Sequence, residues 1–268
     1  MEKSQLPPKS HFPLIDTHAH LYDKRFNDDR EDVVARAAEY GVEKILLPNI
    51  DSTSIDAMLE VEDRFEACQA AMGLHPCSVE KNFEKELYQV EDWLGKRSFI
   101  AVGEIGLDKY WDTTFFEQQL EAFRQQCHWA KQYKIPVMIH VRDAMPEMLK
   151  TLEQIQDGTL SGVIHCFTGT LQEAEQAVKL GFYLGIGGVA TFKNGGLDEV
   201  LPHISADKLI LETDSPYLAP KPFRGKRNSP EYIPYIGQKV ADFQHKPLDE
   251  IAEATTKNAQ TLFNLKHV

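Results

Sequence analysis

The chain has 268 residues, of which 42% are hydrophobic and 26% are charged, and its formal net charge is -12. This composition is typical of a globular protein that buries a core without disulfide bonds. The acidic balance argues against a broad basic surface of the kind that binds duplex DNA tightly, but it is compatible with an anion site that contains metal ions.

The sequence contains no signal for secretion or for membrane insertion. No apolar stretch near the N-terminus resembles a signal peptide, and no run of 18 apolar residues occurs. The four cysteines form no CxxC pair, so we expect reduced thiols rather than a zinc ribbon. The sequence therefore predicts a cytoplasmic protein with no membrane contact, and no obligate protein partner is evident.

A polar N-terminal tail over residues 1–12 precedes one repeating pattern over residues 13–268, in which short apolar runs alternate with longer amphipathic stretches. The apolar runs, in chain order, cover residues 14–16, 44–47, 67–73, 100–102, 136–139, 162–164, 182–186 and 208–211. They are mostly continuous rather than alternating, as expected of strands that are buried on both faces of a parallel sheet.

Three of the intervening stretches have clear helical periodicity, at residues 29–40, 117–133 and 171–180. Gly41 and Gly181 follow the first and the third, where a helix C-cap is expected. Strands that alternate with helices predict βαβ units. Eight such strands favour an α/β fold with a single (β/α)8 TIM-type barrel, which usually has roughly 250 residues. No GxGxxG motif supports a dinucleotide-binding sheet instead.

The first run ends in Asp16-Thr17-His18-Ala19-His20. Histidines at i and i+2 of an extended segment point to the same side, so His18 and His20 can face one metal ion. Taken alone, this motif is more simply interpreted as a surface pair that binds nothing.

Further metal-type ligands occur at or just after later runs: Glu104, His140, His165 and Asp214. A histidine at such a position is usually a structural core residue, and a buried carboxylate needs a partner. Because the active site of a (β/α) barrel lies at the C-terminal ends of its strands, the shared position of all these residues predicts one cluster. Four histidines and two carboxylates suit zinc, manganese or a similar divalent ion.

Candidate substrate-binding residues follow the same strand ends. His75 follows the third run, where it either binds substrate or is structural, and Arg142 comes two residues after His140. Arg224 and Arg227 lie in a basic loop after the last run, where TIM barrels often bind phosphate. The planar guanidinium suits a phosphodiester, although a solvated charged loop is the simpler alternative.

At these residues the chain resembles the TatD family of metal-dependent deoxyribonucleases, which belongs to the amidohydrolase-like TIM barrels. The resemblance covers residues 14–265. Its motifs are DTHAHL at 16–21, GLHP at 73–76, VGEIGLD at 102–108, PVMIHVRDA at 136–144, HCFTG at 165–169, LETDSPYLAP at 211–220 and RGKRNSP at 224–230. The sequence departs from the family at Lys109-Tyr110-Trp111, where members vary widely, so substrate preference does not carry over.

The resemblance implies a site for two divalent metal ions (zinc, magnesium or manganese) with six protein ligands. They are His18, His20 and Asp214 on one ion, His140 and His165 on the other, and Glu104 as the bridge. Phosphotriesterase-like barrels have a carboxylated lysine at the bridging position, so a glutamate there favours the TatD family.

A water shared by two metal ions would have a pKa near about 7, which predicts a metal-bridging hydroxide that attacks phosphorus, with Asp214 as general base. The resemblance implies DNA as substrate, cleaved exonucleolytically from the 3′ end, and the acidic net charge suggests contact with strand ends. The alternatives are an ester or amide hydrolase, such as an aminoacyl-tRNA deacylase, a small-phosphoester hydrolase and, least favoured, a non-catalytic metal-binding scaffold.

Overall fold

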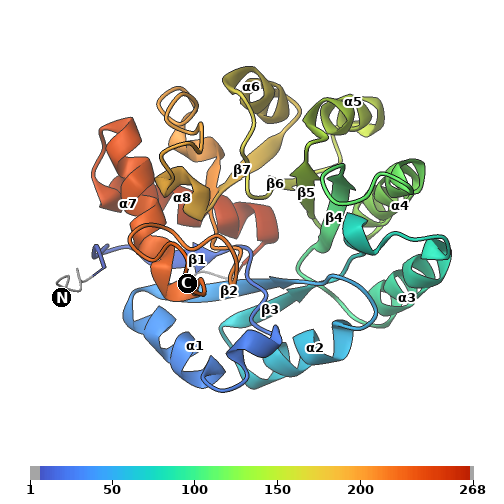
Figure 1. The fold of residues 1–268 in the computed structure, drawn as a ribbon, viewed down its shortest axis with the longest axis horizontal. Helices are drawn as coiled ribbons and strands as arrows, with labels where there is room; N and C mark the ends of the chain where they lie inside the picture. The colour runs from blue at the N-terminus through green and yellow to red at the C-terminus, as the bar shows by residue number, and fades with distance from the viewer. Residues whose placement is uncertain (1–6, 266–268) are drawn as a thin grey trace.

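A computed structural model describes residues 7–265, so the first six residues of the predicted tail lie outside it. Within this range, parallel strands form a ring that is surrounded by helices (Figure 1). The strands are β1 (Leu14–Asp16), β2 (Val42–Pro48), β3 (Cys68–Ala71), β4 (Val102–Asp108), β5 (Val137–Arg142), β6 (Gly162–Ile164), β7 (Phe182–Ile186) and β8 (Leu209–Leu211). The α-helices are α1 (Arg30–Glu39), α2 (Ile55–Arg64), α3 (Phe83–Lys96), α4 (Phe116–Tyr133), α5 (Met145–Ile155), α6 (Leu171–Lys179), α7 (Ile233–Gln244) and α8 (Leu248–Phe263).

Backbone hydrogen bonds close the strands into a barrel. The strands pair in the orders β1-β2-β3 and β4-β5-β6-β7-β8. Between β3 and β4, Met72 N donates to Ala101 O at 3.1 Å and Gly103 N donates to Met72 O at 3.0 Å. Thr17 N donates to Leu211 O at 3.2 Å, which joins β1 to β8. The predicted (β/α)8 TIM-type barrel is therefore confirmed.

Two of the predicted strands were placed too early in the chain. The fourth was expected at residues 100–102, but β4 starts at Val102 and continues to Asp108. Likewise, β5 continues past the predicted end to Arg142. Both extensions contain polar residues because these parts of the strands line the site end of the barrel. Glu104 and His140 thus lie inside strands, rather than after the fourth strand and at the end of the fifth.

The predicted helices are confirmed in α1, α4 and α6, with small differences at their ends. Gly41 and Gly181 have φ values of 84° and 92°, so each ends its helix in the left-handed conformation that glycine adopts without strain. Helix α6 begins with a capping box between Thr170 and Glu173. Among residues 7–265, no helix combines the length and the hydrophobicity needed to cross a membrane.

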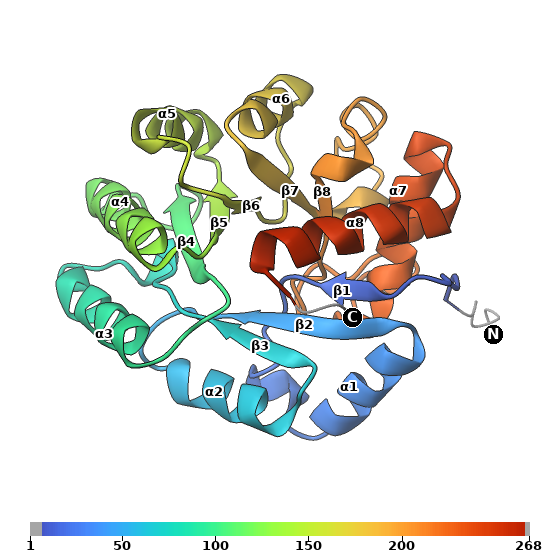
Figure 2. The same ribbon diagram turned by 180° about the vertical axis from the view of Figure 1, so that it is seen from behind.

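Apolar side chains plug the N-terminal end of the barrel. This cluster combines side chains from the barrel strands with the end of α8, and its fully buried members include Ile15, Leu46, Met138 and Ile210, packed near Phe263. Figure 2 shows α8 lying across this end of the barrel. Because this end is filled, the polar residues at the opposite end of the strands form the chemically useful face.

Candidate metal centre

Glu104 lies at the centre of a buried polar cluster and is only 2% exposed. Its Oε2 lies 3.1 Å from Nε2 of His18 and 3.6 Å from Nε2 of His20. Its Oε1 lies 2.9 Å from Nδ1 of His140 and 3.0 Å from Nε2 of His165. The two carboxylate oxygens therefore face two different pairs of histidines.

Asp214 completes the first of these groups. Its Oδ1 lies 3.4 Å from Nε2 of His20 and 3.9 Å from Nε2 of His18. The backbone contributes as well, because Asp214 N donates to His18 O at 2.8 Å. The structure thus brings together all six residues that the sequence singled out as metal-type ligands.

The spacing of these donors fits divalent metal ions. Two donors bound tetrahedrally to one zinc ion, each at about 2.0–2.2 Å, lie about 3.4 Å from one another. The distances from Glu104 and Asp214 to the histidines, 2.9 to 3.9 Å, span that value. His18, His20 and Asp214 form one group in which the ligand atoms all lie within 4.8 Å of one another. Glu104 and His140 form a second group with His75, and His165 belongs to a third with His18 and Glu212.

The charges in the cluster stabilise ionised carboxylates. Burial alone would raise the pKa of Glu104, but the surrounding histidines, His165 foremost, hold that pKa well below its usual range. Burial also opposes ionisation of Asp214, yet the hydrogen bond with His20 and the nearby histidine charges lower its pKa. Both side chains are therefore in the anionic form that a cation requires.

His75 lies beside Glu104, with 3.4 Å between Nε2 and Oε1. Its Nδ1 accepts a hydrogen bond from Cys77 N at 3.1 Å, so the neutral ring carries its proton on Nε2. A protonated Nε2 cannot bind a metal ion, although its position alone would allow this. His75 is therefore suited to donating a hydrogen bond into the site.

Two acidic residues of the cluster were missed as functional residues in the sequence. Asp108 Oδ2 lies 2.8 Å from Nε2 of His140, and Glu212 Oε1 lies 3.2 Å from Nδ1 of His165. Each carboxylate thus holds the ring of a candidate ligand from behind, as partners of metal-binding histidines commonly do. Both lie within quoted motifs, VGEIGLD and LETDSPYLAP, and that was the available signal.

Arg142 is a basic residue close to this cluster in the sequence. It ends β5, two residues beyond His140. Its guanidinium carbon lies 3.6 Å from the centroid of the Tyr110 ring and 5.4 Å from that of Trp111. The arginine therefore belongs to an exposed aromatic group directly after β4.

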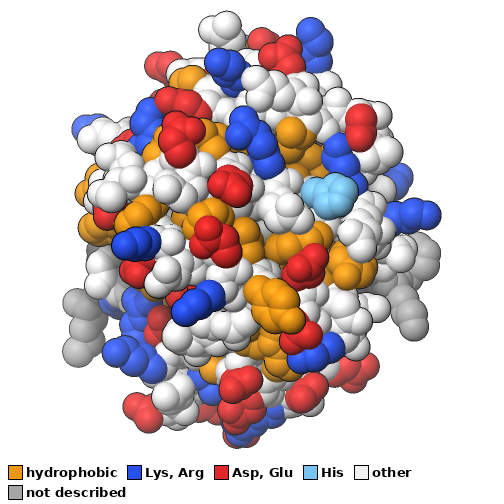
Figure 3. Space-filling model, turned by 90° about the vertical axis from the view of Figure 1, so that its right-hand side faces the viewer, with side chains coloured by type: hydrophobic (Ala, Val, Ile, Leu, Met, Phe, Trp, Pro, Cys, Tyr) orange, Lys and Arg blue, Asp and Glu red, His pale blue; other side chains and the backbone are white. Residues whose placement is uncertain are grey.

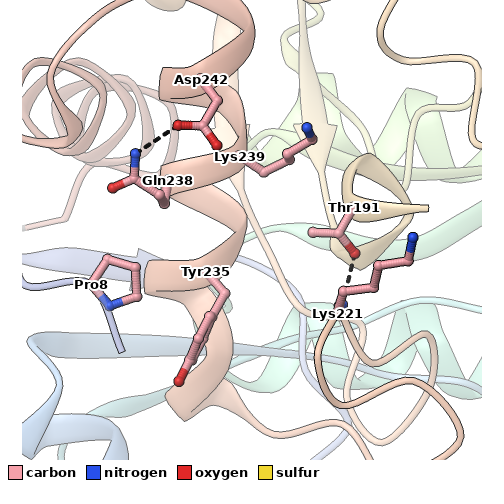
Figure 4. Close-up of a pocket in the computed structure, with 7 residues that line it drawn as sticks. All are labelled: Pro8, Thr191, Lys221, Tyr235, Gln238, Lys239 and Asp242. Atoms are coloured by element: carbon pink, nitrogen blue, oxygen red, sulfur yellow. Dashed lines mark hydrogen bonds between the residues drawn. The ribbon is translucent and has the colours of Figure 1, made fainter. Parts of the chain in front are cut away.

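The loops after β7 and β8 are joined to each other. Lys221 N donates to Thr191 Oγ1 at 2.9 Å (Figure 4). The guanidinium carbon of Arg224 lies 3.7 Å from the centroid of the Phe192 ring. Arg224, Lys193 and Lys221 also line a hollow of about 330 Å³. This part of the basic loop is thus held in place while its cations remain beside an open space.

A second hollow, of about 590 Å³, lies between these loops and the outer side of α7 (Figure 4). It is lined by Pro8, Thr191, Lys221, Tyr235, Gln238, Lys239 and Asp242. None of the six candidate ligands lines it. The hollow therefore belongs to the outer wall of the barrel and not to the polar cluster.

Arg227 has a different environment from Arg224. Its guanidinium forms two hydrogen bonds with the carboxylate of Asp29, at 2.8 and 2.6 Å, and packs over the ring of Phe26. The structure therefore does not bring Arg227 to the cluster, and its expected contact with substrate stays a prediction.

Charge on the outer surface is mixed. On the face shown in Figure 3, acidic and basic side chains are interspersed, with scattered hydrophobic side chains between them. A polyanionic substrate would accordingly be attracted by local cations near the cluster rather than by this face.

Fold and polar cluster together define the class of the protein, which is a metal-dependent hydrolase of the TIM-barrel type. The chain belongs to the family described as TatD related DNase, whose profile matches residues 15–264. The family that its motifs resemble is thereby confirmed.

Individual relatives match over nearly the whole chain. The metal-dependent hydrolase YabD of Bacillus subtilis (strain 168) is 38% identical over 253 residues, which cover 94% of this chain and 99% of that protein. A protein of Salmonella typhimurium named 3′-5′ ssDNA/RNA exonuclease TatD is 33% identical over 258 residues, with coverage of 94% and 99%. The crystal structure of YjjV, a TatD homologue from Escherichia coli K12, matches with a TM-score of 0.89 and 34% identity, covering 94% of this chain and 98% of that one.

Proposed function

We propose that this hydrolase is a divalent-metal-dependent phosphodiesterase that removes nucleotides from the 3′ end of DNA. The observation that carries the proposal is the position of Glu104 between two sets of histidines, which suits a pair of metal ions on either side of one carboxylate. The 33% identical relative that is named as a 3′-5′ exonuclease supports a strand end as substrate.

Six side chains would hold the two ions, which we propose to be zinc, manganese or magnesium. They are His18, His20 and Asp214 on one side, His140 and His165 on the other, and Glu104 between them. When bound, such ions supply Lewis acidity and lower the pKa of water. The carboxylates of Asp108 and Glu212, which contact the far side of the His140 and His165 rings, would fix the orientation of those rings.

The protein's own side chains divide the remaining work. Asp214 is ionised and faces the cluster, so it can accept a proton from the attacking water. His75 can donate a hydrogen bond from its Nε2–H to a non-bridging phosphate oxygen, because its Nδ1 already accepts a hydrogen bond from Cys77 N. Arg142 and Arg224 supply positive charge for neighbouring phosphates.

The test compares labelled substrates under the same metal conditions. Single-stranded DNA labelled at its 5′ end should yield a ladder that shortens one nucleotide at a time, and excess EDTA should stop the reaction. DNA that stays intact while an aminoacyl-tRNA or a small phosphoester is hydrolysed would overturn the proposal. Asp249→Asn, which alters an exposed carboxylate on α8 away from the cluster, should give the same ladder as the unaltered protein.

A further inference from the structure

Two large aromatic side chains stand exposed directly after β4. Tyr110 and Trp111 are 52% and 69% exposed, and their ring centroids lie 4.8 Å apart in an edge-to-face arrangement. Aromatic rings at this exposure are characteristic of binding surfaces when they are grouped and held in place.

A single carboxylate joins this pair to the metal cluster. Asp108 Oδ1 accepts hydrogen bonds from Tyr110 N at 2.9 Å and from Trp111 N at 3.2 Å. The other oxygen of the same carboxylate lies 2.8 Å from Nε2 of His140. Because Asp108 is only 1% exposed, this link is fixed inside the protein while the two rings remain outside.

Arg142 adds a cation to the pair. Its guanidinium carbon lies 3.6 Å from the centroid of the Tyr110 ring, so the planar group covers that ring. Stacked on one aromatic ring, the guanidinium keeps N–H groups available for a phosphate. An aromatic surface with an adjacent cation matches a nucleotide, which carries a flat base and an anion.

We propose that Tyr110, Trp111 and Arg142 form a stacking site for an unpaired nucleobase of the substrate strand, next to the candidate metal centre. This inference rests on the proposed phosphodiesterase function. An unpaired base presents open faces to an aromatic ring, whereas a base inside a duplex is stacked between its neighbours. The site would therefore favour single-stranded ends over duplex ends, with little preference among the four bases.

The barrel topology places a further aromatic residue across the opening. Tyr217 is 46% exposed, follows β8, and carries Arg25 over its ring at 4.4 Å. In a closed ring of eight strands, β8 lies opposite β4. The aromatic pair is thus one side of an opening whose other side also has an exposed ring with an arginine.

The experiment combines a protein change with a substrate change. KM is measured for a short single-stranded DNA and for the same strand with an abasic residue, placed in turn at each position near the 3′ end. Trp111→Ala should raise KM for the intact strand about tenfold, within the range that base stacking produces. One of these positions should be the nucleotide whose base stacks on Trp111. A strand that is abasic there should have a raised KM with the unaltered protein, and Trp111→Ala should raise that KM no further. Equal effects of Trp111→Ala on every strand would overturn the stacking site.

Two further variants control for surface effects. Trp111→Phe keeps an aromatic face and should restore most of the lost affinity. Tyr88 on α3 is even more exposed, at 71%, so Tyr88→Ala should leave KM unchanged if exposure alone is not the cause. A rise in KM with Tyr88→Ala equal to that with Trp111→Ala would contradict the proposal.

Binding measured without cleavage separates this inference from the proposed function. The chain has three tryptophans, so a phosphorothioate strand that resists hydrolysis should quench part of the fluorescence, and Trp111→Phe should abolish that part. If no strand is cleaved but this quenching occurs, the nuclease proposal fails and the nucleobase site stands. If strands are cleaved without quenching that depends on Trp111, or if duplex ends are preferred, the nucleobase site fails and the nuclease proposal stands.

Discussion

Glu212 holds His165 from behind, with 3.2 Å between Oε1 of the carboxylate and Nδ1 of the ring. This contact directs Nε2 of His165 toward Glu104, where a metal ligand is needed. Glu212 is completely buried, and Gly185 in β7 makes room for it, since a Cβ there would lie 2.3 Å from Glu212 Oε2. The loss of this carboxylate should therefore be felt at the metal site.

Glu212→Gln should weaken metal binding. Replacing a partner of a metal-binding histidine typically costs about 10- to 100-fold in metal affinity, and we expect a loss in that range. Competition with a chromophoric chelator measures it. Glu231→Gln, which alters an ion pair with Arg36 outside the cluster, is the control. Unchanged affinity in Glu212→Gln would show that His165 is oriented without help from Glu212.

The proposed stoichiometry is about two divalent ions per chain at saturation. Glu104→Gln removes the charge between the two histidine groups, so we expect it to lower the bound metal well below that value. Metal analysis after gel filtration provides the measurement. A fully loaded structure in which Glu104 and His140 lie far from any ion would contradict the ligand set.

Asp214→Asn should reduce turnover far more than substrate binding. A general base typically contributes about 10²- to 10⁴-fold to the rate, and asparagine cannot accept the proton. The expected result is a fall in kcat of at least about a hundredfold with a smaller change in KM. Metal content must be measured alongside, because Asp214 is also a candidate ligand. Near-normal kcat would remove Asp214 from the mechanism.

Arg224 and Arg227 should respond differently to replacement by alanine. Arg224 borders an open hollow, so Arg224→Ala should raise KM for DNA. The slope of log KM against the logarithm of the salt concentration should fall by about 0.7, the value for one phosphate contact to a single strand. Arg227 is bonded to Asp29, so Arg227→Ala should mainly lower the melting temperature. The effect of Arg224→Ala should be similar across DNA sequences, because phosphate contacts carry no base information. Unchanged KM and salt slope in the double variant would show that this loop does not bind the substrate.

Asp16 should make stability depend on pH. Its buried carboxylate accepts hydrogen bonds from Thr213 N and Oγ1, and burial raises its pKa from 3.8 to about 7. The protonated Asp16 carboxyl group thus loses its proton less readily in the folded state than in the unfolded state. Its contribution to the free energy of unfolding is therefore complete below about pH 4 and is lost as the pH rises through about 7.

In metal-free protein, Asp16→Asn should therefore remove a slope of about 1 kcal/mol per pH unit from the free energy of unfolding between about pH 5 and pH 7. Urea denaturation at several pH values measures that slope. Parallel pH profiles for the two proteins would show that Asp16 is ionised in the folded state throughout this range.

The sequence was sufficient to predict the barrel and to bring six candidate ligands together, because apolar runs and strand-end polar residues have a direct physical meaning in this fold. It placed β4 too early, since the run that identifies a strand stops where the interior becomes polar at Glu104. The contacts of Asp108 with His140 and of Glu212 with His165 join residues from different strands. The order of apolar and polar residues along a single strand gives no information about such contacts. The same limit applies to Arg227, whose partner Asp29 lies at the start of α1.

Helix α8 covers the filled end of the barrel, and β1 meets β8 only after the other strands have been added. His18 and His20 leave the ribosome early in synthesis, whereas Asp214 and α8 follow near its end. A nascent chain therefore carries these histidines for most of its synthesis without Asp214, the last ligand of their group. The first candidate ligand group is thus complete only late in synthesis, so we expect fragments released by premature termination to retain less metal than the completed protein.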